Sequence, residues 1–274
     1  MAGLFSHLLL ATEHTEFDTG AETVAMDLAQ RCQLPLATVV PLVSNPEYEA
    51  LAPQIAARAE REASTKIGQL RAQAETVGVT IDLHVRRGEE PYREIVQEAQ
   101  EQGSDVIIIR RRGKRSFLAN LLVGEMVSKV VAHAPCHVLI VPRESRMWRQ
   151  RVLAAAEPSG QGRQVVATAA AVAAQCGLPL HLVSVIAAEG LRPSAEAFVS
   201  DMLSQVRIGG LVAQGEVLSG NPFKEILAAA ASSGSDLIVM GSRGDSRIGR
   251  ALLGGVAQKV MGLSEHPVLV LHSQ

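Results

Sequence analysis

Glycines gather in one stretch of the second half of the chain, where they could approach a phosphate. The sequence is Gly241-Ser-Arg-Gly244, then nine residues, then Gly254-Gly255-Val256. A short, β-branched apolar run that ends at Met240 precedes it, which predicts a buried strand followed by a glycine-rich turn. Glycine lets a backbone come close to a phosphate, and the start of the next helix offers unpaired N–H groups. The chain contains neither G-x-x-x-x-G-K-[ST] nor G-x-G-x-x-G, so the two common phosphate loops are excluded.

The order of elements around this stretch resembles the nucleotide-binding branch of the universal stress protein family. The Gly-2x-Gly-9x-Gly spacing, an apolar helix over 256–260 and a closing strand over 267–271 carry the resemblance, which covers nearly the whole chain twice. It implies a stress-response regulator whose second half binds an adenine nucleotide (ATP, ADP or AMP, with or without Mg²⁺). The ligand positions that the resemblance implies are Ala156, Glu157, Val185, Met240, Gly241, Arg243, Gly244, Gly254, Gly255 and Val256.

Two of these positions depart from the family pattern. Glu157 stands where the family usually has an aspartate facing the ribose and adenine, and it is one methylene longer. Gly255 stands where the family has a serine or threonine whose hydroxyl helps to hold phosphate. These departures favour an alternative, a scaffold of the same fold that binds no nucleotide and acts through protein contacts. A third reading, slow ATP hydrolysis, would need Mg²⁺ and a positioned water; no catalytic residue is assigned.

The chain is an internal duplication. The strand-like segment Leu8-Leu-Leu-Ala-Thr12 recurs as Val152-Leu-Ala-Ala-Ala156 at an offset of 144, each followed by a glutamate, and Cys32 coincides with Cys176 at the same offset. The offset falls to 130 by the last strands because the first half carries about twelve extra residues, which lie within 46–77 and predict one long amphipathic helix. The predicted domains are residues 1–145 and 146–274.

Each half alternates strands and helices, which predicts an α/β fold. We expect two tandem Rossmann-like domains, of the adenine nucleotide alpha hydrolase type that the resemblance implies. Each would be a five-stranded parallel sheet of order 3-2-1-4-5 with helices on both faces. Ligands bind such sheets at the carboxyl ends of strands one and four, where Glu157 and the glycine turn would meet. By resemblance, the last strands, 138–141 and 268–271, would pair and make an internal pseudo-dimer.

The first half has lost the features that a nucleotide needs. Its equivalent stretch is Arg110-Arg-Arg-Gly113, then ten residues, then Gly124-Glu125. An arginine replaces the first glycine, and a carboxylate stands where a hydroxyl would meet phosphate. Pro41 occupies the adenine-reading position and has no N–H. We therefore expect this half to bind nucleotide poorly or not at all.

The same stretch carries five positive charges in six residues. Side chains there could hold an anion, a lipid headgroup or a nucleic acid phosphate, or they could form a solvated turn. The residues of this weak anion site are Arg110, Arg112, Gly113, Lys114 and Arg115.

Composition and cysteine content limit the kinds of partner and site that the chain can be expected to have. A net charge of −2 gives no general attraction to nucleic acid, and only 3% of residues are aromatic, so nucleic acid is not an expected partner. Three cysteines without a C-x-x-C pair suggest neither a disulfide framework nor a zinc ribbon, and fit a reducing cytoplasm. His133 and His137 straddle a helix end and a strand start, so no metal site is predicted. No membrane span is predicted. A homodimer of tandem chains and an unidentified protein partner are expected.

Overall fold

The computed structural model describes residues 5–44, 53–111, 124–242 and 253–272. Both halves alternate strands and helices in the predicted order. The elements of the first half are β1 (Leu8–Ala11), α1 (Thr19–Cys32), β2 (Leu36–Val43), α3 (Pro53–Thr76), β3 (Ile81–Gly88), α4 (Pro91–Glu101), β4 (Val106–Arg110), α5 (Glu125–His133) and β5 (His137–Val141). Those of the second half are β6 (Val152–Ala155), α6 (Gly160–Cys176), β7 (Leu180–Ile186), a 3-10 turn (Glu189–Leu191), α7 (Arg192–Ile208), β8 (Ala213–Ser219), α8 (Pro222–Ser233), β9 (Leu237–Gly241), α9 (Gly255–Leu263) and β10 (Val268–Leu271).

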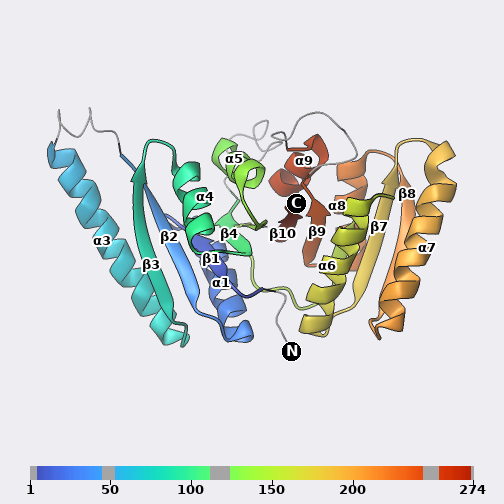
Figure 1. Ribbon diagram of the computed structural model, residues 1–274, viewed down its shortest axis with the longest axis horizontal. Coiled ribbons are helices and arrows are strands. Elements are labelled where there is room, and N and C mark those ends of the chain that lie inside the picture. The colour runs from blue at the N-terminus through green and yellow to red at the C-terminus, as the bar shows by residue number, and fades with distance from the viewer. Residues whose placement is uncertain (1–4, 45–52, 112–123, 243–252, 273–274) are drawn as a thin grey trace.

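All ten strands belong to one sheet, in the order β3-β2-β1-β4-β5-β10-β9-β6-β7-β8 (Figure 1). Within each half the strands are parallel and follow the expected order 3-2-1-4-5. The structure differs from the prediction of two five-stranded sheets in one detail. β5 and β10 pair antiparallel, with Leu139 opposite Leu269, and so join the two sheets into one. The predicted pairing of the last strands is thereby confirmed, and each half hides the other's open edge.

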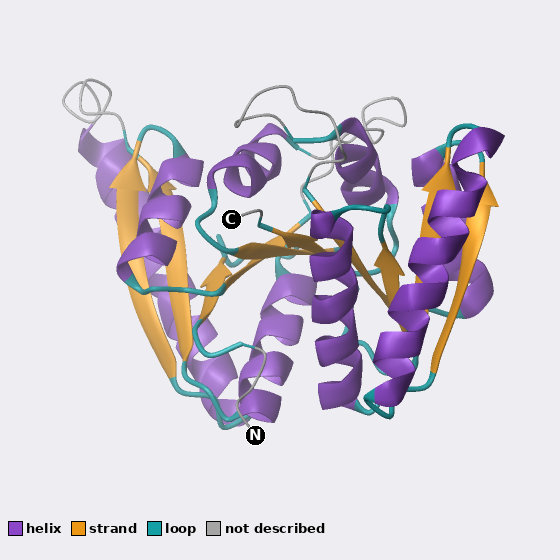
Figure 2. Cartoon of the chain, turned by 45° about the vertical axis from the view of Figure 1, so that its right-hand side comes forward, coloured by secondary structure: helices purple, strands orange, loops and turns teal. Residues whose placement is uncertain are grey.

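Apolar strands explain why helices cover both faces of this sheet (Figure 2). β4 and β6 are buried almost throughout, so their side chains need a cover above and below. One core packs α1 and α6 against one face, and a second packs α4, α5, α8 and α9 against the other. Both cores run from the first half into the second through β5 and β10. Trp148, in the segment that joins β5 to β6, is buried in the first core, so this segment is part of the packing.

The extra residues of the first half form the predicted long helix. α3 has 24 residues and buries Leu70 and Ala74, while its counterpart α7 has 17. No helix in the described ranges has the length and apolar character needed to cross a membrane.

A buried carboxylate connects α4 to the edge strand β3. Glu98 is 1% exposed, and it accepts hydrogen bonds from His84 Nδ1 (2.5 Å), Gln102 Nε2 (2.9 Å) and Arg86. Burial raises the pKa of Glu98, but these three hydrogen bonds outweigh burial and leave the pKa below its ordinary value. The hydrogen bond to Glu98 in turn raises the pKa of His84.

We expect Glu98→Gln to destabilise the chain most between about pH 4.5 and 6.5, the ordinary pKa values of the two groups. The lowered pKa of Glu98 stabilises the fold at pH values above the ordinary glutamate pKa, and this stability is lost as the pH falls through the pKa of the folded state. The raised pKa of His84 stabilises the fold at pH values below the ordinary histidine pKa, and this stability is lost as the pH rises through the pKa of the folded state. Urea unfolding at pH 5.5 should show a loss of about 1–3 kcal/mol, and a smaller one at pH 3. Glu101→Gln, which removes an exposed partner of Arg86, is the control and should cost less than about 1 kcal/mol. If the loss of stability in Glu98→Gln did not change with pH, the ionised Glu98 carboxylate would not be the source of the stability.

Candidate functional site

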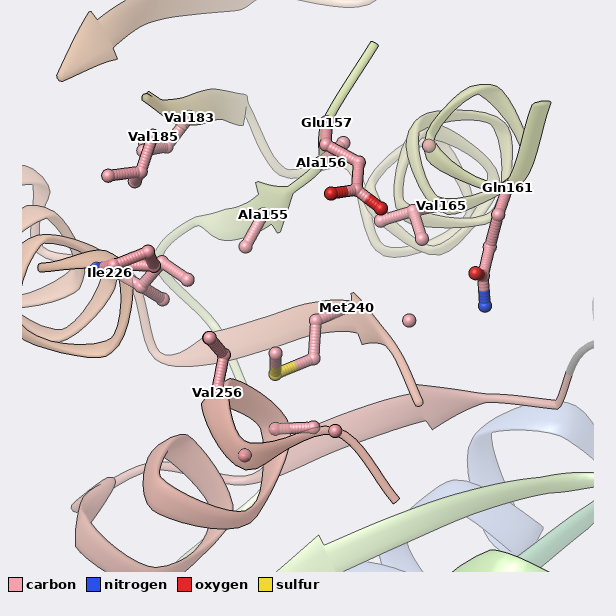
Figure 3. A pocket seen from close by; sticks show the side chains of 16 residues that line it. Ala155, Ala156, Glu157, Gln161, Val165, Val183, Val185, Ile226, Met240 and Val256 are labelled. Carbon is pink, nitrogen blue, oxygen red and sulfur yellow. The ribbon is translucent and has the colours of Figure 1, made fainter. Parts of the chain in front are cut away.

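A cavity of about 310 Å³ opens at the carboxyl ends of β6, β7 and β9 (Figure 3). β6 and β9 are neighbours, and they are strands one and four of the second half. The cavity therefore lies at the point where the strand order reverses, as the topology predicts. Its lining residues are Ala155, Ala156, Glu157, Gln161, Gly162, Val165, Val183, Val185, Pro222, Ile226, Met240, Gly241, Gly254, Gly255, Val256 and Ala257.

The first turn of α6 forms one wall of this cavity. Ser159 caps the helix, and its Oγ accepts a hydrogen bond from the N–H of Gly162 at 2.9 Å. A Cβ atom at Gly162 would lie 1.9 Å from the carbonyl oxygen of Glu157, so only glycine permits this close approach. The turn thus holds Glu157 and Gln161 at the cavity, where Figure 3 shows both side chains.

The backbone of β7 supplies polar groups at another wall. The N–H of Ala156 donates to the carbonyl of Val183 at 3.0 Å, so Val183 directs its backbone groups toward β6. Alternate residues of a parallel strand face the same neighbour. Val185 therefore directs its N–H and C=O to the same side, two residues beyond the level of Ala155, where β6 ends. These groups can read the edge of a planar base.

The start of α9 supplies the third feature, an N-terminus without a side-chain cap. Gly254 is the N-cap, and its N–H donates to the carbonyl of Ser242 at 2.9 Å. The first N–H groups of the helix have no acceptor within it, and they carry the positive end of its dipole. A Cβ atom built at Gly255 meets no described atom within 4 Å. This end of the cavity suits an anionic group.

Eight of the ten predicted ligand positions line this one cavity: Ala156, Glu157, Val185, Met240, Gly241, Gly254, Gly255 and Val256. The other two, Arg243 and Gly244, lie outside the described residues. The other eight lining residues were not predicted from the sequence: Ala155, Gln161, Gly162, Val165, Val183, Pro222, Ile226 and Ala257. A helix expected directly after Glu157 could have indicated that Gln161, Gly162 and Val165 lie near the cavity. The places of Pro222 and Ile226 depend on how α8 packs.

Glu157 is the single ionisable side chain among the described residues that line the cavity. An acid–base pair would need a second one. The described lining therefore offers binding groups, mainly backbone amides and apolar side chains, rather than catalytic ones.

In the first half, a buried ion-pair network stands at the equivalent place. Arg110 is the last residue of β4 and is buried. Its guanidinium donates to Asp18 Oδ2 at 3.2 Å, Glu13 Oε2 at 2.9 Å and Thr15 Oγ1 at 2.8 Å. Beside it, Thr12 Oγ1 donates to Glu22 Oε1 at 2.7 Å. We call these six residues the plug: Thr12, Glu13, Thr15, Asp18, Glu22 and Arg110.

The repeat shows what the plug replaces. At the offset of 144, Thr12 corresponds to Ala156 and Asp18 to Gly162. By the fourth strands the offset has fallen to 131, so Arg110 corresponds to Gly241 at the start of the glycine turn. All three counterparts line the cavity of the second half. The first half therefore places polar side chains where the second has small residues around a cavity.

Other departures of the first half also have a structural place. Pro41 lies in β2 at the position of Val185, and the N–H of Thr12 donates to Val39 at 3.1 Å, as that of Ala156 does to Val183. Glu125 begins α5 as Gly255 begins α9; it is exposed and pairs with Lys129 at 3.1 Å.

The basic run beginning at Arg110 is partly committed to internal contacts. Arg110 is paired with two carboxylates, which makes it poorly suited to hold an external anion. Arg111 donates to the carbonyls of Gly262 (3.2 Å) and Ser264 (2.5 Å), so it caps the carboxyl end of α9 in the other half. The remaining members of the predicted anion site, Arg112, Gly113, Lys114 and Arg115, lie outside the described residues.

The two histidines near Cys136 make separate contacts. His133 Nδ1 lies 2.8 Å from the carbonyl of Lys129, while His137 Nδ1 accepts from the N–H of His272 at 3.1 Å. Burial, followed by the charge of His272, lowers the pKa of His137. Each histidine thus takes part in local packing.

Comparison with known proteins gives a consistent result. The family model "Universal stress protein family" matches residues 5–142 and 149–272, which confirms a tandem arrangement; the boundary at 145/146 stays a prediction. A universal stress protein of Mycobacterium tuberculosis is 26% identical over 247 residues, 82% of either chain. One of Bacillus subtilis is 32% identical over 110 residues, 40% of this chain and 74% of the relative. The crystal structure of a universal stress protein from Archaeoglobus fulgidus has a TM-score of 0.79 at 21% identity, covering 98% of this chain and 96% of that one, and it shares the fold.

Proposed function

We propose that this chain, which belongs to the universal stress protein family, binds one adenine nucleotide, in the cavity of its second half. The observation that carries the proposal is the cavity itself, which joins the backbone groups of Val185 to the open N-terminus of α9. Its volume of about 310 Å³ is at the lower end of the range for small-ligand sites. Nucleotide occupancy would regulate the hold on a partner or a second copy, provided the two states differ in affinity.

The lining suggests how the nucleotide would lie. The adenine would occupy the apolar end between Val183, Ile226 and Met240, where the backbone of Val185 reads its edge. Glu157 would face the ribose hydroxyls. The phosphates would meet the N–H groups at the start of α9.

A second candidate, a scaffold that binds no nucleotide, is favoured by Gly255. The helix start lacks the hydroxyl that the family uses at this position, so one phosphate donor is missing. Under this reading, the predicted homodimer and the protein contacts would carry the function without a ligand.

Titration calorimetry of the whole chain with ATP and AMP separates the two candidates. Nucleotide binding predicts saturation at one ligand per chain and a higher melting temperature. A ligand at a hundred times its Kd stabilises by about 2.7 kcal/mol. Neither heat nor a thermal shift at millimolar ATP would favour the scaffold.

Val185→Pro tests the adenine end of the cavity. We expect the affinity for ATP and AMP to fall by the same factor, about 2- to 10-fold, because one hydrogen bond of about 0.5–1.5 kcal/mol is lost. The variant should fold, since β2 of the same chain already contains Pro41 at the equivalent position. The matched control, Pro41→Val, should leave the stoichiometry at one, because the plug remains. An unchanged affinity of Val185→Pro would place the base elsewhere.

A further inference from the structure

Two cysteines, one from each half, lie at the ends of α1 and α6. Cys32 is the last residue of α1, and Cys176 is the last residue of α6. Both helices run to the same end of the molecule and finish near its middle, as Figure 1 shows. Each is followed by a left-handed residue, Gln33 or Gly177, so the two helix ends have the same backbone turn.

Hydrogen bonds between the halves hold these two ends together. Arg31 Nη2 donates to the carbonyl of Cys176 at 3.3 Å, and Gln175 Nε2 lies 3.8 Å from the sulfur of Cys32 as its donor. In each helix, the residue directly before the cysteine thus contacts the cysteine of the other helix. Both cysteines therefore lie in the contact between these two helix ends.

The surroundings of the two thiols leave them accessible. Cys32 and Cys176 are both free and partly exposed, and both pack against the core under α1 and α6. Burial raises the pKa of Cys32, and the charge of Cys176 is the next largest cause of the rise. Cys136 differs, because it is buried and desolvation raises its pKa to about 12. A thiolate is the reactive form, so Cys136 should react slowly.

We propose that Cys32 and Cys176 form a reversible disulfide that ties the two halves together, with a small-molecule disulfide as the oxidant. The thiolate of one cysteine attacks the S–S bond of the oxidant, which gives a mixed disulfide and releases one small thiolate. The second cysteine attacks the protein sulfur of the mixed disulfide, forms the new S–S bond and releases the second small thiolate. The protons lost by the cysteines convert both leaving groups to thiols, so the oxidant is reduced as the protein is oxidised.

The position of both cysteines at helix ends favours this reaction. Disulfide geometry requires Cα atoms within about 7 Å, and the last turn of a helix is the part that shifts most readily to meet it. The bond would join residues 32 and 176, which are 176 − 32 = 144 positions apart. A covalent link across so long a loop restricts the unfolded chain strongly, so the oxidised form should resist unfolding better than the reduced form.

Oxidised glutathione added to the reduced whole chain tests the proposal. After denaturation, titratable thiols should fall from three to one per chain, and the mass should fall by about 2 Da. Peptide mapping should recover a link between the segments that contain Cys32 and Cys176. The urea midpoint should rise on oxidation and return after addition of dithiothreitol.

Single variants provide the controls. Cys136→Ser should form the link as the unaltered chain does, while Cys32→Ser and Cys176→Ser should form none and show no reversible rise in the urea midpoint. A stable adduct with glutathione as the end product, a link that includes Cys136, or a link between two chains would each overturn the proposal.

Discussion

Gly255→Ser should tighten ATP binding about tenfold or more, and Gly255→Glu should weaken it by two orders of magnitude or more. A hydroxyl at this position would donate to a charged phosphate, and such a bond contributes about 1.5–3 kcal/mol. A carboxylate would instead repel the phosphates; two like charges about 4 Å apart near a protein surface cost on the order of 4 kcal/mol. The first half already carries this carboxylate, as Glu125.

The structure leaves room for the first atom of a side chain at position 255. A Cβ atom at Gly255 meets no described atom within 4 Å, and the position is the first of α9, where a side chain does not interrupt the helix. Gly255→Gln is the matched control, since it has the size of the glutamate without its charge. Calorimetry with adenosine separates charge from fit, because a ligand without phosphate should bind all four proteins alike. If Gly255→Glu bound ATP as tightly as the unaltered chain does, the phosphates could not lie at the start of α9.

The fold was predictable from sequence because its signals are local and occur twice. Apolar runs such as Val106–Arg110 show the strands, and the offset between Leu8 and Val152 shows the repeat. Once the strand order is fixed, the carboxyl ends of strands one and four must be adjacent. Glu157 and Gly255 could therefore be brought together although nearly a hundred residues separate them.

The parts of the site that could not be predicted depend on packing between distant segments, which no local sequence pattern encodes. Ile226 reaches the cavity only through the position of α8 against β7, and the sequence around it reads as an ordinary amphipathic helix. Cys32 and Cys176 coincide in the repeat, yet their contact depends on how the two halves join at β5 and β10. The replacement of a glycine by Arg110 was visible, but its partner Asp18 lies 92 residues away and nothing in the sequence pairs them.

Arg110→Ala should lower the free energy of unfolding by about 3–5 kcal/mol. Removing one member of a buried ion pair leaves the other charge without compensation, and Asp18 is only 1% exposed. Thr15 would still donate to Asp18 through its N–H and hydroxyl, so part of the carboxylate's hydrogen bonding would survive. Urea unfolding of the whole chain measures the loss. Arg143→Ala is the control: its pair with Glu16 is exposed on both sides and should contribute less than about 1 kcal/mol.

A double variant separates the charge from the space it fills. Arg110→Met with Asp18→Asn removes the two buried charges and keeps most of the volume. The other carboxylate that pairs with Arg110, Glu13, is 31% exposed and can be hydrated, so the double variant should recover much of the stability that Arg110→Ala loses. Neither protein should gain a second nucleotide site, because Pro41 still lacks its N–H and Glu125 still places a carboxylate at the start of α5. If Arg110→Ala lost less than 1 kcal/mol, the plug would be a solvated surface pair. If it bound two nucleotides per chain, Arg110 alone would be what closes the first half.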